Sequence, residues 1–341
     1  MKKIRLKALW ILLLLGSHTF LQAKTSPLTV YVYDSFVGDS TLGEVIQKLA
    51  LEKLGVKTEF VSFSSAGEAL NQILIEGDKT KADLLIGIDE SLLSRAWESH
   101  RFQILPDTVY KSVPSEHHFD PKKQFVPFDY GYLTLVYDSQ KVKDLDNPIS
   151  WDHFLRQKSF WNQVAIQDPR TSSIGFSFLL WTLSLRGDQW PDFWKEFRPF
   201  IAVTAPGWSG AYGLFLKGEV QFVVSYTTSP AYHIEKEKNS NIKALVFNGG
   251  HIRQTEGIGL VKTSKQPELA KKWISLLLSK KVQSELPTKQ WMYPVNPQVK
   301  LPKSFEALAK VKSVKNPDSK LISTKRQEWL RNWTQIVSEV K

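Results

Sequence analysis

Apolar runs and amphipathic segments alternate along the first part of the chain. Residues 28–34 (LTVYVYD) are mostly β-branched or aromatic, which predicts a strand. Residues 41–55 carry apolar side chains at helical spacing and end at Gly55, which predicts a helix. A strand, a helix and a nearly all-apolar strand follow over 56–89, as is typical of parallel strands covered on both faces. This alternation predicts an α/β architecture.

A second set of strand and helix patterns occupies the middle of the chain, and further strand and helix patterns follow it. An aromatic-rich extended segment (126–138) precedes further strand and helix patterns up to the strand VQFVVSY, followed later by IGLVK (258–262) and two amphipathic helices. We expect two α/β lobes, with the chain crossing between them near 126–130 and 240–255. The expected division is residues 24–128 plus 244–341 for lobe I and 129–243 for lobe II. A cleft between two lobes is a favoured ligand site.

The N-terminal segment has the pattern of a secretory signal peptide. Four basic residues, Lys2, Lys3, Arg5 and Lys7, precede a short apolar run, and Ala23 offers a small residue for cleavage. The apolar run is too short to span a bilayer. We therefore expect residues 1–23 to be a signal peptide and the mature protein to be soluble and periplasmic.

The composition argues against several classes of function. The net charge is +11, but Lys and Arg are scattered, and their local density at 310–326 suits a solvated surface better than a nucleic-acid site. The seven histidines form no HExxH pattern and there is no cysteine, so we expect no metal site. No G-x-S-x-G motif is present. An exported hydrolase using Ser172 or Ser209 stays open as an alternative.

Two hydroxyl-rich segments precede predicted helices. They are DPRTSSIG (168–175) and VVSYTTSPAYH (223–233), and in the second we expect Ser229 to cap a helix that starts at Pro230. Backbone amides at a helix start favour anions, although any one such serine can be a plain cap. Two such starts in one lobe favour a polar ligand.

The aromatic residues divide into two groups. Most of the twelve tryptophans lie at helical spacing, and we expect Trp181, Trp194, Trp273, Trp329 and Trp333 to belong to the core. Trp208, Trp291 and the strand-end Tyr33 lie instead at turns, where aromatic faces around a cleft suit flat heterocycles and cations. Asp34 could supply a negative charge beside Tyr33, or could simply be a turn residue.

Several stretches carry a resemblance to a known family. They are TVYVYDSF, FVPFDYGY, QDPRTSS with the GFSFLLW helix, GWSGAYGLFLKGE, VSYTTSPAYH, KQPELAKKWISLLLS and QWMYPV. On these stretches the chain resembles the periplasmic thiamine-binding proteins of bacterial ABC importers over nearly its whole mature length. The resemblance implies a two-lobed type II periplasmic binding protein fold with a hinge and an interlobe cleft.

The resemblance also implies a ligand, which would be thiamine, thiamine monophosphate or thiamine pyrophosphate, and a set of contacts. The ring-contacting aromatics would be Tyr33, Trp208, Tyr226, Tyr232 and Trp291. The phosphate or hydroxyethyl contacts would be Ser172, Ser173, Thr227, Thr228 and Ser229. The family has an acidic-glycine pair at the start of the second helix, where this chain has Ser65 and Ala66. Ser65 or the backbone would have to replace that acid, or a one-residue shift would bring Gly67 into register with the glycine of the pair.

The missing acid keeps a second ligand class open, namely another small cationic or phosphorylated metabolite such as a thiamine precursor pyrimidine. A related thiamine-degrading enzyme depends on a cysteine nucleophile, which this chain lacks. We therefore expect a binding protein and not an enzyme, with no cofactor, a membrane permease as partner and a monomeric state.

Overall fold

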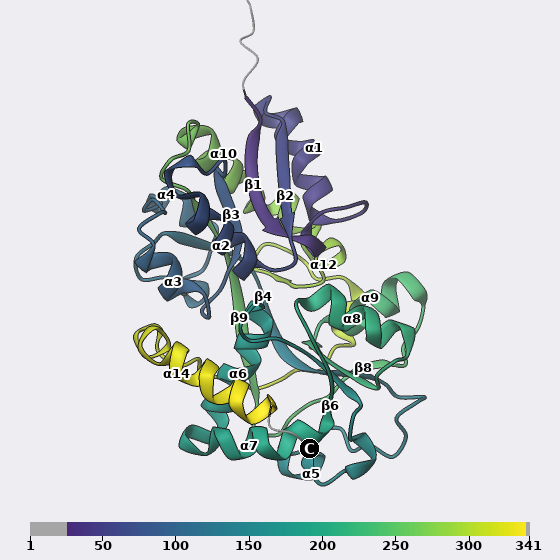
Figure 1. The fold of residues 1–341 in the computed structure, drawn as a ribbon. Coiled ribbons are helices and arrows are strands. Elements are labelled where there is room, and N and C mark those ends of the chain that lie inside the picture. Colours follow the sequence, from purple (N-terminus) through teal and green to yellow (C-terminus); the bar gives the residue numbers. More distant parts are fainter. Residues whose placement is uncertain (1–25, 339–341) are drawn as a thin grey trace, which may run out of the picture.

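The computed structural model describes residues 26–338, and the expected signal peptide lies outside them. Eleven strands are described there (Figure 1). They are β1 (Leu28–Tyr33), β2 (Thr58–Phe63), β3 (Leu84–Ile88), β4 (Phe125–Asp138), β5 (Val164–Gln167), β6 (Ile201–Ala205), β7 (Phe222–Tyr226), β8 (Ile242–Ala244), β9 (His251–Leu260), β10 (Tyr293–Pro294) and β11 (Ser313–Val314).

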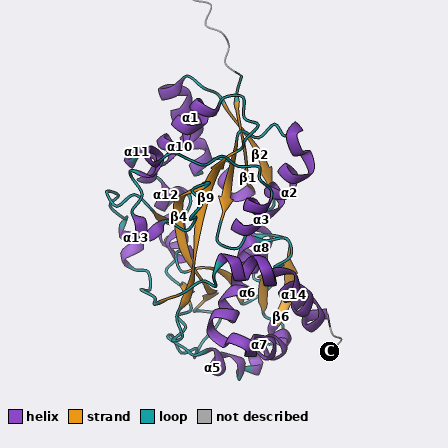
Figure 2. Cartoon of the chain, turned by 90° about the vertical axis from the view of Figure 1, so that its left-hand side faces the viewer, coloured by secondary structure: helices purple, strands orange, loops and turns teal. Residues whose placement is uncertain are grey.

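The helices alternate with these strands and cover the sheet (Figure 2). They are α1 (Leu42–Leu54), α2 (Ala66–Glu76), α3 (Leu93–Glu98), α4 (Asp107–Tyr110), α5 (Trp151–Leu155), α6 (Ser173–Arg186), α7 (Trp190–Phe197), α8 (Trp208–Lys217), α9 (Ser229–Tyr232), α10 (Pro267–Leu277), α11 (Lys280–Gln283), α12 (Leu286–Lys289), α13 (Lys303–Glu306) and α14 (Ser319–Ser338). The alternation read from the sequence is therefore present.

Two long antiparallel strands, β4 and β9, join the two ends of the sheet. The strand order is β2-β1-β3-β9-β4-β7-β5-β6, with β8 and β10 paired to β4 and β11 paired to β9. Parallel pairs flank this centre, β1 with β2 and β3 on one side and β5 with β6 and β7 on the other. The β4–β9 ladder is irregular between Pro127 and Asp129. The C-terminal helix α14 packs on both α3, which follows β3, and α7, which precedes β6, so it connects helices from the two halves of the sheet (Figure 1).

Helix boundaries follow local chemistry. Thr41 and Ser150 cap α1 and α5 with their side chains, and Gly55 and Gly218 end α1 and α8 in the left-handed conformation. The expected cap at Ser229 is wrong by one residue. Thr228 occupies the cap position without a side-chain cap bond, and the Ser229 hydroxyl bonds the Ser225 hydroxyl at 2.8 Å.

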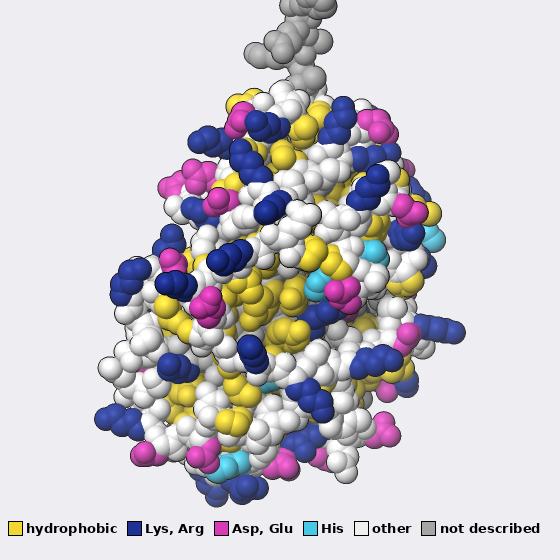
Figure 3. Space-filling model, turned by 180° about the vertical axis from the view of Figure 1, so that it is seen from behind, with side chains coloured by type: hydrophobic (Ala, Val, Ile, Leu, Met, Phe, Trp, Pro, Cys, Tyr) yellow, Lys and Arg dark blue, Asp and Glu magenta, His cyan; other side chains and the backbone are white. Residues whose placement is uncertain are grey.

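The expected core tryptophans are buried. Trp181, Trp194, Trp273 and Trp333 are among the largest fully buried side chains, and Trp329 is also buried. Trp181 donates its Nε1 proton to the Gly250 carbonyl, which pairs the polar end of a buried indole. Figure 3 shows, on the rear face, Lys and Arg side chains scattered among acidic and apolar ones and not gathered into one basic patch.

Candidate ligand-binding site

A cavity of about 630 Å³ lies between the two ends of the sheet. Both sides of the molecule supply its walls, through the end of β1, the starts of α2, α6 and α8, the β7–α9 turn, and the segment after α12. A volume in this range suits a drug-sized organic ligand. Eleven of the residues expected from the sequence lie on its walls: Tyr33, Asp34, Ser65, Ala66, Ser172, Ser173, Trp208, Tyr226, Ser229, Tyr232 and Trp291.

Thr227 and Thr228 are the two expected residues that do not line the cavity. Both are fully buried, and neither hydroxyl has a hydrogen-bond partner. The backbone NH of Thr227 donates to the Tyr132 carbonyl at 2.8 Å, which ties the turn to β4. These two residues therefore belong to the buried interior of the turn and not to the cavity wall.

The aromatic walls are held by specific contacts. Trp208 donates to the Ser225 hydroxyl at 2.8 Å and stacks on Tyr212, with ring centroids 4.7 Å apart. Elsewhere on the cavity wall Tyr232 meets Trp291 edge to face at 5.2 Å. Both indoles are partly exposed, unlike the core tryptophans, so part of each ring stays available to a ligand.

His233 supports the Trp208 wall from behind. This histidine is buried. Its Nδ1 lies 2.7 Å from Glu237 Oε2 and its Nε2 lies 2.9 Å from the Tyr212 hydroxyl. With the Nδ1 proton donated to the carboxylate, Nε2 accepts from Tyr212 and fixes the ring on which Trp208 stacks.

Three helices of ten or more residues, α2, α6 and α8, begin at the cavity wall. Their N-termini present unpaired backbone NH groups and the positive end of the helix dipole, which favours an anion. Ser172 caps α6 with its side chain. Lys236 and Lys289 also line the cavity and add positive charge.

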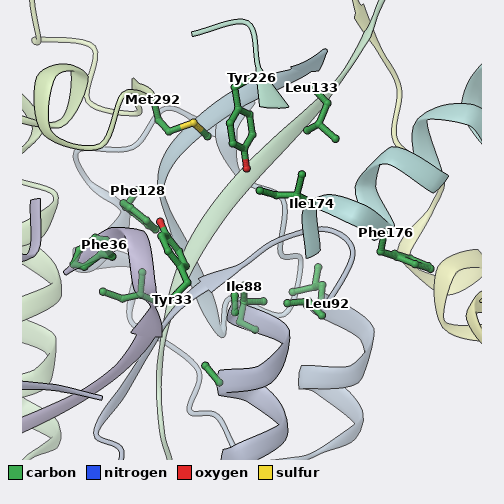
Figure 4. Packing of buried hydrophobic residues seen from close by; sticks show 14 of the residues in the cluster. Tyr33, Phe36, Ile88, Leu92, Phe128, Leu133, Ile174, Phe176, Tyr226 and Met292 are labelled. Atoms are coloured by element: carbon green, nitrogen blue, oxygen red, sulfur yellow. The ribbon is translucent and has the colours of Figure 1, made fainter. Parts of the chain in front are cut away.

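The opposite charge comes from Glu256, which sequence reasoning missed. It lies on β9 and is buried on the cavity wall, where it accepts a 2.6 Å hydrogen bond from the Tyr33 hydroxyl. Gln290 in turn donates to the Tyr33 hydroxyl at 2.7 Å. Figure 4 shows Tyr33 and Tyr226 among the buried side chains at this centre, reaching in from different strands. Burial and the nearby Glu256 raise the pKa of both phenols well above the ordinary value, so both keep their protons.

Ser65 bonds across the cleft. Its hydroxyl accepts from the backbone NH of Glu68 at 3.1 Å and donates to the Thr171 carbonyl at 2.8 Å. A second bond across the cleft runs from the Ser209 hydroxyl to Asp34 at 2.8 Å. The described conformation is thus one in which the two sides of the cleft touch.

The site gives no support to a serine hydrolase or to a metal centre. Among residues 26–338, no serine hydroxyl is hydrogen-bonded to a histidine ring, and Ser209 is engaged with Asp34. In the same range, His, Asp and Glu side chains form no group of three suited to a metal ion.

Comparison with known proteins defines the class of the chain. Residues 79–319 match the model of the bacterial extracellular solute-binding proteins, so the chain belongs to this class. The thiamine-binding periplasmic protein of Escherichia coli (strain K12) is 40% identical over 314 residues, which cover 91% of this chain and 93% of that protein. Its counterpart in Brucella melitensis biotype 1 is 34% identical over 340 residues, covering 99% of this chain and 100% of that protein. The chain therefore belongs to the family of thiamine-binding periplasmic proteins, and the resemblance read from its sequence is confirmed.

Solved structures agree on the fold. A periplasmic thiamin binding protein superposes with a TM-score of 0.85 at 38% identity, covering 92% of this chain and 96% of that one. A ferric binding protein from Campylobacter jejuni, at 18% identity and a TM-score of 0.76, shares the fold alone. The expected type II binding-protein fold is confirmed, and the match is to solute-binding proteins and not to enzymes. Within residues 26–338, no helix combines the length and apolar character needed to cross a membrane.

Proposed function

We propose that this protein is a periplasmic receptor that binds thiamine or its phosphate esters in the cavity and delivers them to the permease of an ABC importer. The observation that carries the proposal is that one aromatic-walled cavity contains both a buried carboxylate and the positively polarised starts of three helices. Thiamine joins an aminopyrimidine ring to a cationic thiazolium ring with a hydroxyethyl arm, which the esters extend with phosphate. The cavity offers aromatic faces, a buried carboxylate and converging helix starts to these three parts.

In this proposal Tyr33, Trp208, Tyr226, Tyr232 and Trp291 contact the rings. Stacking and cation–π contacts of this kind contribute about 0.5–2 kcal/mol each. Ser172, Ser173 and Ser229, with the helix-start amides, contact the hydroxyethyl or phosphate group. Thr227 and Thr228 act by shaping the turn that presents Ser229.

We further propose lobes with the boundaries expected from the sequence, 24–128 plus 244–341 and 129–243, moving about a hinge. The irregularity between Pro127 and Asp129 in β4 supports the first boundary, since disrupted ladders bend more easily. Ligand binding would favour the closed form and present it to the permease. Export through residues 1–23 and a monomeric state complete the proposal.

Native mass spectrometry of the protein as purified tests which ligand it carries. A retained mass equal to thiamine or one of its phosphates supports the proposal. A retained pyrimidine precursor or unrelated phosphorylated metabolite would instead support the second ligand class, which the serine at position 65 keeps open.

A further inference from the structure

Two carboxylates lie directly opposite each other beneath the cavity. Asp129 on β4 is the cross-strand partner of Glu256 on β9, where the ladder is irregular. Asp129 is fully buried, and no donor reaches either of its oxygens. Glu256 is also buried, but it lies on the cavity wall. Two like charges placed in this way repel each other strongly unless a proton is shared or a cation arrives.

The buried environment of Asp129 and Glu256 favours a proton on this pair of carboxyl groups. Burial, followed by the charge of Glu256, raises the pKa of Asp129 well above its ordinary range. Burial also raises the pKa of Glu256 to about 7, against the hydrogen bond from Tyr33. Near neutral pH Asp129 therefore keeps its proton and can donate a hydrogen bond to Glu256. Glu256 itself gains or loses its proton in this pH range.

Within residues 26–338 Glu256 is surrounded mainly by acidic groups and phenols, and Lys236 and Lys289 are cations that line the same cavity. The titratable groups around it are the Tyr33 phenol (β1), Asp89 and Glu90 (after β3), Asp129 (β4) and the Tyr226 phenol (β7). The nearby guanidiniums act elsewhere, since Arg253 (β9) lowers the pKa of Glu90 and Arg326 (α14) lowers that of Asp89. Neither Asp129 nor Glu256 forms an ion pair with a described Lys or Arg.

We propose that Glu256 is the anionic contact that selects a positively charged ligand ring, and that Asp129 is a positioning residue whose proton holds the pair at a single negative charge. This inference rests on the proposed thiamine function and names the group that recognises the cation. When the cation enters, protonated Glu256 loses its proton to the solvent and the carboxylate pairs with the ring charge. The site therefore exchanges a proton for its cation and favours a cationic ring over a neutral one of the same shape.

The pH dependence follows with a definite sign. Below about pH 7 the empty site holds a proton on Glu256 that binding must expel, so affinity for the cation falls as the pH is lowered and approaches a tenfold loss per unit well below pH 7. Above pH 8 Glu256 is already ionised and affinity is constant. A neutral analogue of thiamine, in which a thiophene replaces the thiazolium ring, gains nothing from this ionisation.

Titration of the full mature chain, monitored by tryptophan fluorescence between pH 6 and 8.5, tests the inference. The two probes are thiamine and its neutral thiophene analogue. We expect the dissociation constant for thiamine to rise about fivefold from pH 7 to pH 6, with no such rise for the analogue. Glu256→Gln should weaken thiamine binding at pH 8 at least tenfold and abolish the dependence. Asp129→Asn keeps an uncharged donor next to Glu256 and should leave the midpoint of the dependence near pH 7, whereas Asp129→Ala removes that donor and should move the midpoint above pH 7.

Glu90→Gln is the matched control. Its carboxyl has a pKa raised to about 7 by burial and by Asp89, but it does not line the cavity. We expect this variant to retain the dependence with a midpoint slightly below that of the wild type, because the Glu90 charge helps to raise the pKa of Glu256. Circular dichroism checks that each variant is folded. A dependence lost in Glu90→Gln, or unchanged in Glu256→Gln, would overturn the inference.

The same titration separates this inference from the proposed function. Binding of thiamine with one affinity across the whole pH range, or equal dependence for the neutral analogue, would overturn the role of Glu256 alone. Failure of the wild-type protein to bind thiamine at any pH would overturn the proposed function, and this inference with it.

Discussion

At the scale of one residue, the backbone conformation of Trp291 places its side chain on the cavity wall. Its φ is 61°, in the left-handed region that a bulky residue rarely adopts. Such a conformation costs roughly 1–3 kcal/mol and is retained where the surrounding structure requires it, often at binding sites. Here it places an indole on the cavity wall against Tyr232.

Replacing this aromatic pair should weaken binding. We expect Trp291→Ala and Tyr232→Ala each to raise the dissociation constant for thiamine by about 3- to 30-fold, the loss of one stacking or cation–π contact. Trp291→Phe should restore most of the affinity, because it keeps an aromatic face. Trp161→Ala, on the surface away from the cavity, is the control. Fluorescence titration measures all four, and unchanged affinity in both alanine variants would contradict the aromatic clamp.

A buried histidine makes stability depend on pH. His251 accepts from the Phe247 amide at 2.9 Å and donates to the Leu133 carbonyl at 2.7 Å, and burial lowers its pKa to about 4. The unfolded chain protonates this residue near pH 6.5, so its contribution is full above that pH and declines as the pH falls toward 4. We expect it to cost about 2 kcal/mol of unfolding free energy between pH 7.5 and 5. Urea unfolding should show a correspondingly smaller loss in His251→Gln; an equal loss in both proteins would refute the assignment.

Sequence reasoning located the aromatics and hydroxyls of the cavity but missed Glu256 and Tyr212. Composition around turns pointed to Trp208 and Ser172. Glu256 depends on strand register, although one acidic residue in the apolar strand TEGIGL was a detectable signal, since such residues are rarely buried unpaired. Tyr212 lies four residues after Trp208, on the same face of α8, so its spacing also carried information.

At the scale of elements, the start of α2 approaches the starts of α6 and α8 across the cleft. A Cβ atom at Gly207 would lie 2.4 Å from the Ser64 carbonyl oxygen, and one at Gly67 would lie 2.8 Å from the Thr171 carbonyl oxygen. The sequence predicted these helices and their ends from periodicity and glycine. It could not predict their contact, because that depends on how two separately folded layers meet.

Gly207→Ala should obstruct this contact without harming the fold. Gly207 has an extended backbone with φ of −151°, which alanine adopts freely, so the clash exists only when the cleft is closed. We expect affinity for thiamine to fall about tenfold while the melting temperature of the unliganded protein is unchanged. Gly210→Ala, where the new Cβ meets only an ordinary contact at 3.6 Å, is the matched control. Equal affinities of the two variants would argue against the closed contact.

At the scale of the whole molecule, β4, β9 and α14 connect the two sides of the cleft. The two-lobed class was predictable, because strand and helix patterns recur in two blocks and then return to the first. The lobe boundaries stay a prediction. The packing of α14 against both α3 and α7 was not predictable. Its amphipathic pattern shows that one face is buried, but it does not show which elements cover that face.

Small-angle scattering tests the hinge. If ligand favours the closed form, saturating thiamine should lower the radius of gyration of the ligand-stripped protein. Gly207→Ala should show a smaller change, and Gly210→Ala the full one. An identical radius with and without ligand, in protein shown to bind it, would contradict a hinge motion.

Calorimetric titration of ligand-stripped protein with thiamine, its monophosphate and its pyrophosphate tests the central claim most directly. The aromatic walls, the buried Glu256 and the converging helix starts predict saturable one-to-one binding of at least one of these compounds at micromolar concentration or below. The absence of both binding heat and thermal stabilisation with all three would contradict the account.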